Sequence, residues 1–394
     1  MRILMIAPEP FFEPRGTPFS EYHRIRALTD LGHEVVLVTY PFGRDVTMSG
    51  LTICRSWRPP FARRVKIGPS VLKVLLDLGL AVRAAHVATR GTFHLVHSHE
   101  EGGAIGLVLA RLLRVPHLYD MHSSLPEQLS NFNVTRSSVM VGAFRWLERQ
   151  MVNRSAAIIV ICRHLEEHVR RLRPAAPVVL IENAPGSAES METAEAGRVR
   201  AETGIADDAP LVVYTGTFEA YQGLDLLLAA MRTVVGQLPG ARLLLVGGRP
   251  DQVARAREDA QLAGVGHLTV FAGERPAEEV PHFLAAANAL ASPRSRGTNT
   301  PLKIYQYLRA GRPIVATNLL THTQVLNPDV ALLTDPTPEA FGAGLARVLA
   351  DRTLAEQIVR NAKHLAETQY TYEAYLERTR QALAAVGPAL GRTS

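Results

Sequence analysis

The chain has 394 residues, of which 47% are hydrophobic and 20% are charged, as is typical of a soluble globular protein with two or three domains. Its two cysteines, Cys54 and Cys162, exclude a disulfide framework and a cysteine metal site, which favours a reducing cytosol. No apolar stretch is long enough to cross a bilayer, and the first apolar run, which ends at Pro8, is too short for a signal peptide.

Apolar strands alternate with amphipathic helices through the first half of the chain. A strand at Ile3–Ala7, a helix from about Phe19 to Leu31 that Gly32 closes, and a strand at Val35–Thr39 open the pattern. Continuous apolar strands between helices indicate a parallel sheet that is covered on both faces. Further strands are expected at Leu95–His97, His117–Tyr119, Ala157–Ile161 and Val178–Ile181.

The pattern pauses at Asn183–Ser190, which we interpret as a linker, and then starts again. The sequence therefore predicts an α/β protein with two doubly wound Rossmann-like domains that face each other across a cleft. The predicted domains are 1–187 and 188–370, with a C-terminal helix at about 371–394 that can pack back on the first. Strands of the second domain are expected at Leu211–Tyr214, Leu243–Val246, Thr269–Phe271, Ala289–Ala291, Ile314–Ala316 and Ala331–Leu333, with helices from about Pro338 to Ala385 at the end.

Positive charge is concentrated in the first half. Residues 1–185 contain 23 Lys and Arg against 15 Asp and Glu, whereas residues 186–394 contain 20 against 22. From Arg55 to Arg90 there are eight Lys and Arg and one acid, Asp77, mixed with Val and Leu at near-helical spacing. Two interpretations stay open: a helix that faces the core with a solvated basic side, or a basic amphipathic helix on an anionic membrane surface.

Three polar loops of the first domain follow predicted strands. The loop Pro8–Thr17 contains Gly16 and Thr17, where a ligand could approach the backbone, although it lacks Gly-x-Gly-x-x-Gly. The segment His97–Gly103 holds two histidines and two acids but no clear third metal ligand, so we expect polar residues at a strand end and no metal site. His122 follows another strand and is expected to reach the cleft, in a catalytic or a structural role.

Two glycine loops open helices of the second domain. Tyr214–Asp225 contains Gly216 and Gly223 but no Lys or Arg, which makes it a weak phosphate site alone. Leu243–Arg249 ends a strand with two glycines, where a base or ribose could lie against Gly247, or where the chain simply turns.

The stretch Pro293–Thr317 is the most informative of the chain. It predicts a basic loop, a short helix from about Pro301 to Arg309, a stop at Gly311 and an apolar strand. Arg294, Arg296 and Lys303 lie close to the expected helix start. Cations and free backbone N–H groups together would form a socket for an anion such as a diphosphate.

Taken in order, five segments resemble the retaining glycosyltransferases of family 4 (glycosyl transferases group 1), which have the GT-B architecture. These segments are Gly32–Thr39, Val96–His99, Ile181–Pro185, Tyr214–Asp225 and Ala287–Thr317.

The resemblance implies transfer of a sugar from a nucleoside-diphosphate donor with retention of anomeric configuration and without a cofactor or divalent metal. It assigns the donor to the second domain and the acceptor to the first. It also implies that His122 lies near the reacting sugar and that Gly16 approaches the donor phosphates. The residues expected to contact the donor are Gly16, Thr17, Gly216, Thr217, Gln222, Gly247, Arg275, Arg294, Arg296, Thr298, Asn299, Thr300, Pro301, Leu302 and Gln306, with His122 and Lys303 acting in the reaction.

The sequence departs from the family pattern at four positions. Thr217 and Gln222 replace an Arg and a Lys that contact the diphosphate, and Thr298 and Gln306 replace two glutamates. We expect Lys303, with Arg294 or Arg296, to supply the missing positive charge.

The function predicted from the sequence is thus a retaining hexosyltransferase of polysaccharide biosynthesis. Its acceptor is expected to be a glycan or lipid-linked saccharide, its location the cytoplasm or the inner membrane face, and no nucleic-acid partner is expected. Two alternatives stay open: a nucleotide-sugar epimerase, which needs no acceptor, and a degenerate paralogue that binds a partner transferase.

Overall fold

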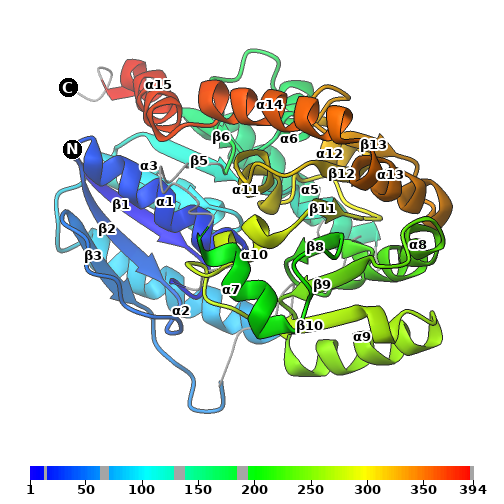
Figure 1. Cartoon of the computed structure of the whole chain (residues 1–394). Coiled ribbons are helices and arrows are strands. Elements are labelled where there is room, and N and C mark those ends of the chain that lie inside the picture. The colour runs from blue at the N-terminus through cyan, green and yellow to red at the C-terminus, as the bar shows by residue number, and fades with distance from the viewer. Residues whose placement is uncertain (13–15, 63–70, 128–137, 184–193, 391–394) are drawn as a thin grey trace. The chain divides into compact units, whose positions relative to one another are not determined.

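A computed structural model describes residues 1–12, 16–62, 71–127, 138–183 and 194–390 (Figure 1). The chain forms two compact units. The first consists of Met1–Pro185 together with Tyr372–Ser394, and the second of Gly186–Thr371. Parts of the predicted linker, of the first glycine loop and of the basic stretch, at 184–193, 13–15 and 63–70, lie outside the described residues.

The first unit is built on a parallel sheet of seven strands in the order β3-β2-β1-β4-β5-β6-β7. Its strands are β1 (Arg2–Ala7), β2 (Glu34–Thr39), β3 (Leu51–Arg55), β4 (Leu95–His99), β5 (His117–Met121), β6 (Ala157–Val160) and β7 (Val178–Leu180). Its helices are α1 (Gly16–Asp30), α2 (Val71–Ala88), α3 (Gly102–Leu113), α5 (Ser138–Arg154), α6 (Arg163–Leu172) and α15 (Tyr372–Leu390).

The two faces of this sheet bury different helices. Ile3 and Met5 of β1 pack with α1 and with α15, so the C-terminal helix belongs to the core of the first unit. Leu4 and Ile6 point the other way, toward α2 and α3, and α5 and α6 cover the same face further along. Strands that are buried on both faces account for the uninterrupted apolar runs in the sequence.

The second unit repeats the plan with six parallel strands in the order β10-β9-β8-β11-β12-β13. Its strands are β8 (Leu211–Thr215), β9 (Arg242–Val246), β10 (Thr269–Gly273), β11 (Ala289–Ser292), β12 (Ile314–Thr317) and β13 (Leu332–Thr334). Its helices are α7 (Ala194–Thr203), η1 (Ala220–Gln222), α8 (Leu224–Gln237), α9 (Pro250–Leu262), η2 (Gly266–Leu268), α10 (Val280–Ala286), α11 (Lys303–Arg309), α12 (Leu320–Thr323), α13 (Pro338–Ala350) and α14 (Arg352–Gln369).

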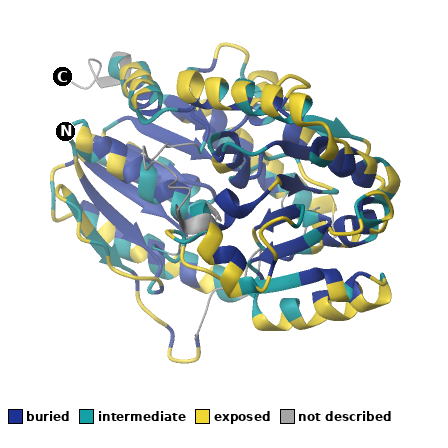
Figure 2. Cartoon of the chain, viewed as in Figure 1, coloured by how far each residue is buried: buried dark blue, intermediate teal, exposed yellow. Residues whose placement is uncertain are grey.

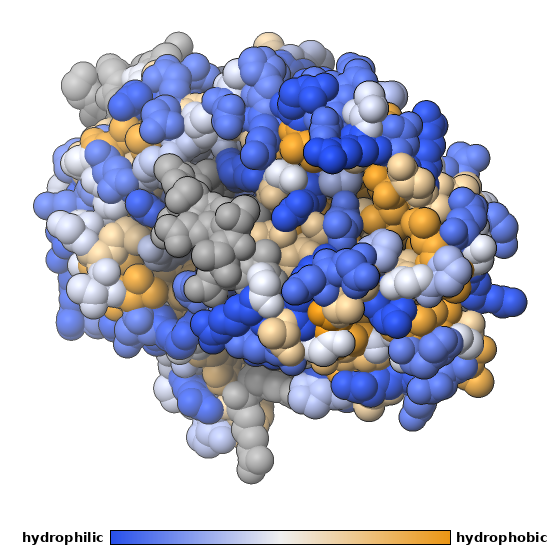
Figure 3. Space-filling view, in the orientation of Figure 1, coloured by the Kyte–Doolittle hydropathy of each residue, from blue (hydrophilic) through white to orange (hydrophobic). Residues whose placement is uncertain are grey.

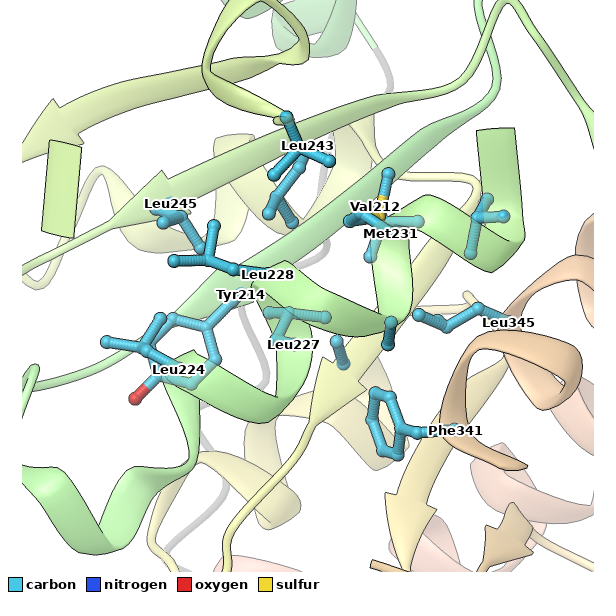
Figure 4. Close-up of a cluster of buried hydrophobic side chains, with 14 of the residues drawn as sticks. Val212, Tyr214, Leu224, Leu227, Leu228, Met231, Leu243, Leu245, Phe341 and Leu345 are labelled. Atoms are coloured by element: carbon cyan, nitrogen blue, oxygen red, sulfur yellow. The ribbon is translucent and has the colours of Figure 1, made fainter. Parts of the chain in front are cut away.

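Leucines of α8 form the centre of the second core. Leu227 and Leu228 are buried against Val212 of β8 and Leu243 of β9, and Phe341 of α13 closes the cluster (Figure 4). In both units the strands are buried and the outer helix faces are exposed (Figure 2). None of the helices in the described ranges combines the length and the apolarity that crossing a membrane requires.

The predicted elements agree with the structure except at two points. The edge strand β3 was not predicted, because Thr52 and Arg55 interrupt its apolar pattern. The helix expected from Pro301 begins at Lys303, with Leu302 as its N-cap, and is seven residues long. Gly311, with φ of +66°, follows that helix as expected.

Gly223 cannot carry a side chain. Its φ is +73°, and an added Cβ would lie 2.0 Å from the carbonyl oxygen of Pro293, on the chain that follows β11. We expect Gly223→Ala to lower the free energy of unfolding by about 2–4 kcal/mol, because strain and a backbone clash add together. Gly264→Ala is the matched control, because its φ is +74° and nothing lies within 4 Å of the added Cβ. It should cost only about 1–2 kcal/mol, and equal losses in urea titrations would contradict the close approach.

Candidate functional site

A lysine without a hydrogen-bond partner lies at the carboxyl end of the second sheet. The strand order reverses at β8, whose neighbours are β9 and β11, and such switch points are where open α/β sheets bind ligands. Lys303 is 8% exposed and its Nζ has no hydrogen-bond partner, although Nζ lies 3.7 Å from the centre of the Tyr214 ring. Burial, and then the nearby Arg294, hold the pKa of Lys303 well below its usual range.

Tyr307 fixes the position of Lys303. It lies one helical turn after Lys303 on α11, so both side chains point inward. The Tyr307 hydroxyl accepts a hydrogen bond from the backbone N–H of Thr215 at 3.0 Å and donates to the carbonyl of Ala291 at 3.4 Å. Thr215 is the last residue of β8, and Ala291 is the last but one of the neighbouring β11. Tyr307 therefore ties α11, which carries Lys303, to the carboxyl ends of both strands.

Backbone, not side chains, surrounds this lysine. Gly216 follows β8 with φ of +135°, and its Cα side faces Lys303, since an added Cβ would lie 3.5 Å from Nζ. Gly247 follows β9 and packs against Gly216, since a Cβ added at Gly247 would lie 2.0 Å from the Gly216 carbonyl oxygen. Both positions therefore need glycine because these loops pack closely, Gly247 against the main chain and Gly216 beside Lys303 and the Tyr214 hydroxyl.

Thr217 and Gln222, which stand where the family carries a basic pair, lie in the same loop. The Gln222 side-chain amide donates to Thr217 Oγ1 at 3.4 Å, and Gln222 Oε1 is buried without a hydrogen-bond partner. The carbonyl of Thr217 accepts from the hydroxyl of Tyr214 at 2.7 Å. Thr300 Oγ1, in the loop before α11, is also buried without a hydrogen-bond partner.

Of the other basic residues expected here, only Arg294 lies near enough to affect the pKa of Lys303. Arg294 braces its own loop by donating to the carbonyls of Arg296 and Asn299, at 2.9 and 3.0 Å. Arg296 is exposed, and Arg275 is exposed and ion-paired with Glu279 at 3.6 Å.

The remaining predicted donor contacts belong to this braced loop or to α11. Thr321 donates to the Asn299 carbonyl and Gln324 to the Thr298 carbonyl, both at 2.6 Å. Pro301 is buried and Leu302 half-buried, whereas Gln306, three residues after Lys303 on α11, is exposed.

The first unit contains a buried cluster of histidines around one ion pair. Arg24 of α1 donates to Asp120 of β5 at 2.9 Å, and both side chains are fully buried. His97 and His99 of β4 stack beside them, and His122 Nε2 lies 3.2 Å from both Asp120 Oδ1 and His99 Nδ1. His122 is only 4% exposed.

Asp120 corrects the expectation that the two strand histidines lack a third metal ligand. Asp120 pairs in register with His99 on the neighbouring strand, and ligand atoms of His97, His99 and Asp120 lie within 4.8 Å of one another. However, Asp120 already forms an ion pair with the Arg24 guanidinium. The positive charge of Arg24 would repel a divalent cation at this carboxylate. Burial raises the pKa of Asp120, but Arg24, His122 and His99 outweigh burial and hold it well below the usual range.

Glu100 is one of the two acids in the segment His97–Gly103, for which the sequence predicted polar residues at a strand end and no individual role. It follows β4 with a left-handed backbone, φ of +47°, and accepts hydrogen bonds from the Ser123 hydroxyl at 3.1 and 2.9 Å. Burial raises its pKa to about 7, against the lowering effect of His122. The strained backbone at a strand end was the missing signal, and it is not readable from sequence.

Of the first glycine loop, the structure describes Gly16, which begins α1, and Thr17, which is half-buried.

We expect Asp120→Asn to lower the free energy of unfolding by about 3–5 kcal/mol, because it leaves the Arg24 charge buried without a carboxylate. Glu34→Gln is the matched control, because its pair with Arg2 at 3.9 Å is exposed, and such pairs are worth about 0–1 kcal/mol. Urea unfolding measures both. A small loss for Asp120→Asn would mean that Arg24 finds another partner.

Two family descriptions match the chain. Residues 22–184 match "glycosyl transferase 4-like domain" and residues 196–365 match "glycosyl transferases group 1". Sulfoquinovosyl transferase SQD2 of Arabidopsis thaliana is 24% identical over 326 residues, which are 79% of this chain and 58% of that protein. The chain thus spans less than two thirds of the length of this relative.

Solved structures show the same fold. Sucrose-phosphate synthase from Thermosynechococcus elongatus superposes with a TM-score of 0.78 at 20% identity, covering 98% of this chain and 99% of that chain. HepE of Anabaena, solved in complex with UDP-glucose, gives a TM-score of 0.74 at 16% identity with coverage of 98% and 99%. The chain therefore belongs to the glycosyl transferases group 1, the retaining glycosyltransferases of family 4 with the GT-B fold.

Proposed function

We propose that this chain transfers a sugar from a nucleoside-diphosphate donor to a saccharide acceptor with retention of configuration, the second unit binding the donor. The observation that carries the proposal is Lys303, a buried amine without a hydrogen-bond partner, beside Gly216 and Gly247. A buried polar group without a partner costs stability, so such a group is retained where a ligand completes it. A diphosphate supplies the negative charge that this lysine lacks.

In the proposed reaction, Lys303 stabilises the charge that develops on the departing diphosphate. The negative charge of a bound diphosphate raises the depressed pKa of Lys303, so at a pH between the pKa of the free and of the bound lysine it draws a proton onto Nζ. The first unit would bind the acceptor. In this proposal His122, which lies beside Asp120, and Glu100, which accepts from Ser123, are the polar side chains that face the acceptor. No divalent metal is assigned a role, because Lys303 and the main chain provide the positive field.

The acceptor in this proposal is a glycan or a lipid-linked saccharide at the inner face of a membrane. Names of relatives support the donor class only by analogy: SQD2 is called a sulfoquinovosyl transferase, and HepE was solved with UDP-glucose. Thermal shift with UDP, GDP, ADP and dTDP tests the donor, since a ligand that binds the folded state raises the melting temperature. No shift with any of the four would overturn the donor site.

Thr298 and Gln306, in place of the family glutamates, favour a second candidate, a paralogue that binds donor without transferring it. Product analysis with donor and a panel of acceptors separates the candidates. Transfer supports the enzyme, isomerised donor supports an epimerase, and UDP stabilisation without any turnover supports the paralogue.

We expect Lys303→Met to slow transfer by about 10²–10³-fold, because it removes one charge-assisted contact to the leaving group. The same change should raise the stability of the ligand-free protein by about 1–3 kcal/mol, because it removes a buried amine without a partner. Steady-state kinetics and urea unfolding give the two readouts. Lys363→Met on the exposed side of α14 is the control for loss of a lysine. A variant that is both slow and less stable would indicate a structural lysine.

At a pH above the depressed pKa of free Lys303, binding of UDP should take up a proton onto Nζ. Above the depressed pKa of the free lysine, the protein must gain this proton to bind the anion, so affinity falls as pH rises. Below that pKa the lysine is already charged and its contribution to the pH dependence disappears. Calorimetry in buffers of different ionisation enthalpy measures the uptake, and Lys303→Met should abolish it. An unchanged uptake in the variant would assign the proton to another group.

A further inference from the structure

The outer surface of α2, α3 and α5 is unusually apolar. Of the fifteen large hydrophobic side chains that are exposed among the described residues, eleven lie between Trp57 and Trp146. They are Trp57, Phe61, Val74, Leu75, Leu78, Val82, Val108, Leu112, Val139, Met140 and Trp146, and we call them, with the arginines beside them, the helical face. The three helices cover one face of the first sheet, and α3 lies between α2 and α5 and contacts both.

The spacing on α2 shows a stripe that its own core does not need. Leu76, Leu80 and Ala84 are buried against the sheet, whereas Val74, Leu78 and Val82 recur every four residues on the exposed side. Figure 3 shows one face of the molecule, on which hydrophilic residues surround separate hydrophobic patches. Exposed apolar surface of this extent marks a binding site.

All acidic side chains of the three helices are turned inward. Asp77 of α2 accepts from the Tyr40 hydroxyl, and Glu148 of α5 binds the Leu125 N–H and His168 at 2.9 and 2.7 Å. Glu101, just before α3, pairs with Lys73. The charged side chains that remain exposed on the described parts of these helices are arginines: Arg111, Arg145, Arg149 and Arg154, with Arg83 half-buried.

We infer that the helical face docks on an anionic lipid surface. Apolar side chains flanked by arginines suit the boundary between acyl chains and negative headgroups, and tryptophan is enriched there. A second copy of the chain is a poorer occupant, since it would bring arginine-bearing faces together without acids between them. This inference deepens the proposed function, because docking would bring the acceptor-binding unit to a lipid-linked acceptor.

The chain carries its own reporters of this contact. Its only two tryptophans, Trp57 and Trp146, are 65% and 62% exposed and both belong to the helical face. Vesicles that contain phosphatidylglycerol should shift tryptophan emission to the blue and carry the protein into the pellet. Vesicles of phosphatidylcholine alone should do so far less, and added salt should reverse part of the binding.

Paired variants localise the contact. Leu78→Glu with Val82→Glu should weaken vesicle binding at least about tenfold, because two charges would enter the headgroup boundary. Leu262→Glu in the second unit is the matched control, since Leu262 is 87% exposed on α9 and lies outside the helical face. Arg145→Gln with Arg149→Gln should reduce both the affinity and its salt dependence.

Thermal shift with UDP on the same variants separates this inference from the donor site. Substitutions in the helical face should weaken vesicle binding and leave stabilisation by UDP unchanged. Vesicle binding that persists without UDP stabilisation would overturn the donor proposal and leave the lipid surface standing. No emission shift, or equal loss of binding in Leu262→Glu, would overturn the lipid surface. A dimer whose tryptophans are shielded without lipid would overturn it in favour of self-association.

Discussion

The donor-binding proposal depends on a lysine buried inside the second unit, where its amine finds no hydrogen-bond partner among the described residues and an unpaired ammonium charge would be costly. Lys303 lies over the Tyr214 ring and against the main chain at Gly216, and Tyr307 ties its helix to the ends of β8 and β11. An aromatic face compensates only part of the cost of burying such a charge. The glycines matter because they allow close packing here: Gly216 lies beside the lysine, and Gly247 packs against the main chain of Gly216.

The first unit handles buried charge in the opposite way. Arg24 and Asp120 neutralise each other, and the histidines lie around this pair with lowered pKa values at His97 and His99, chiefly through burial. Arg24 also lies over the Tyr375 ring of α15 at 5.1 Å. Its polar groups are therefore rigidly arranged before any ligand arrives, whereas the lysine of the second unit is completed by its ligand.

The sequence predicted the elements better than the contacts between them. Parallel strands were readable because burial on both faces makes them apolar throughout, and only the edge strand β3, with Arg55, escaped this rule. Lys303 was singled out from its neighbours in the chain, but its approach to Tyr214 depends on how α11 packs on β8. The exposure of Gln306 and the hydrogen bonds that Arg294 makes within its own loop also depend on packing, whereas their predicted contacts with a donor stay predictions. Register between β4 and β5 brought Asp120 to His99, which no single segment reveals.

The assignment of α15 to the first unit has a consequence for how the protein is made. The ribosome completes the second unit, Gly186–Thr371, before it has synthesised Tyr372–Leu390, although the first unit began to emerge earliest. Until then the face of the first sheet that packs with Tyr375, Ala382 and Val386 lacks part of its cover. Domains usually fold from the N-terminus onward during synthesis. In this chain the first unit, which is synthesised first, can complete its fold only after the second unit has been synthesised.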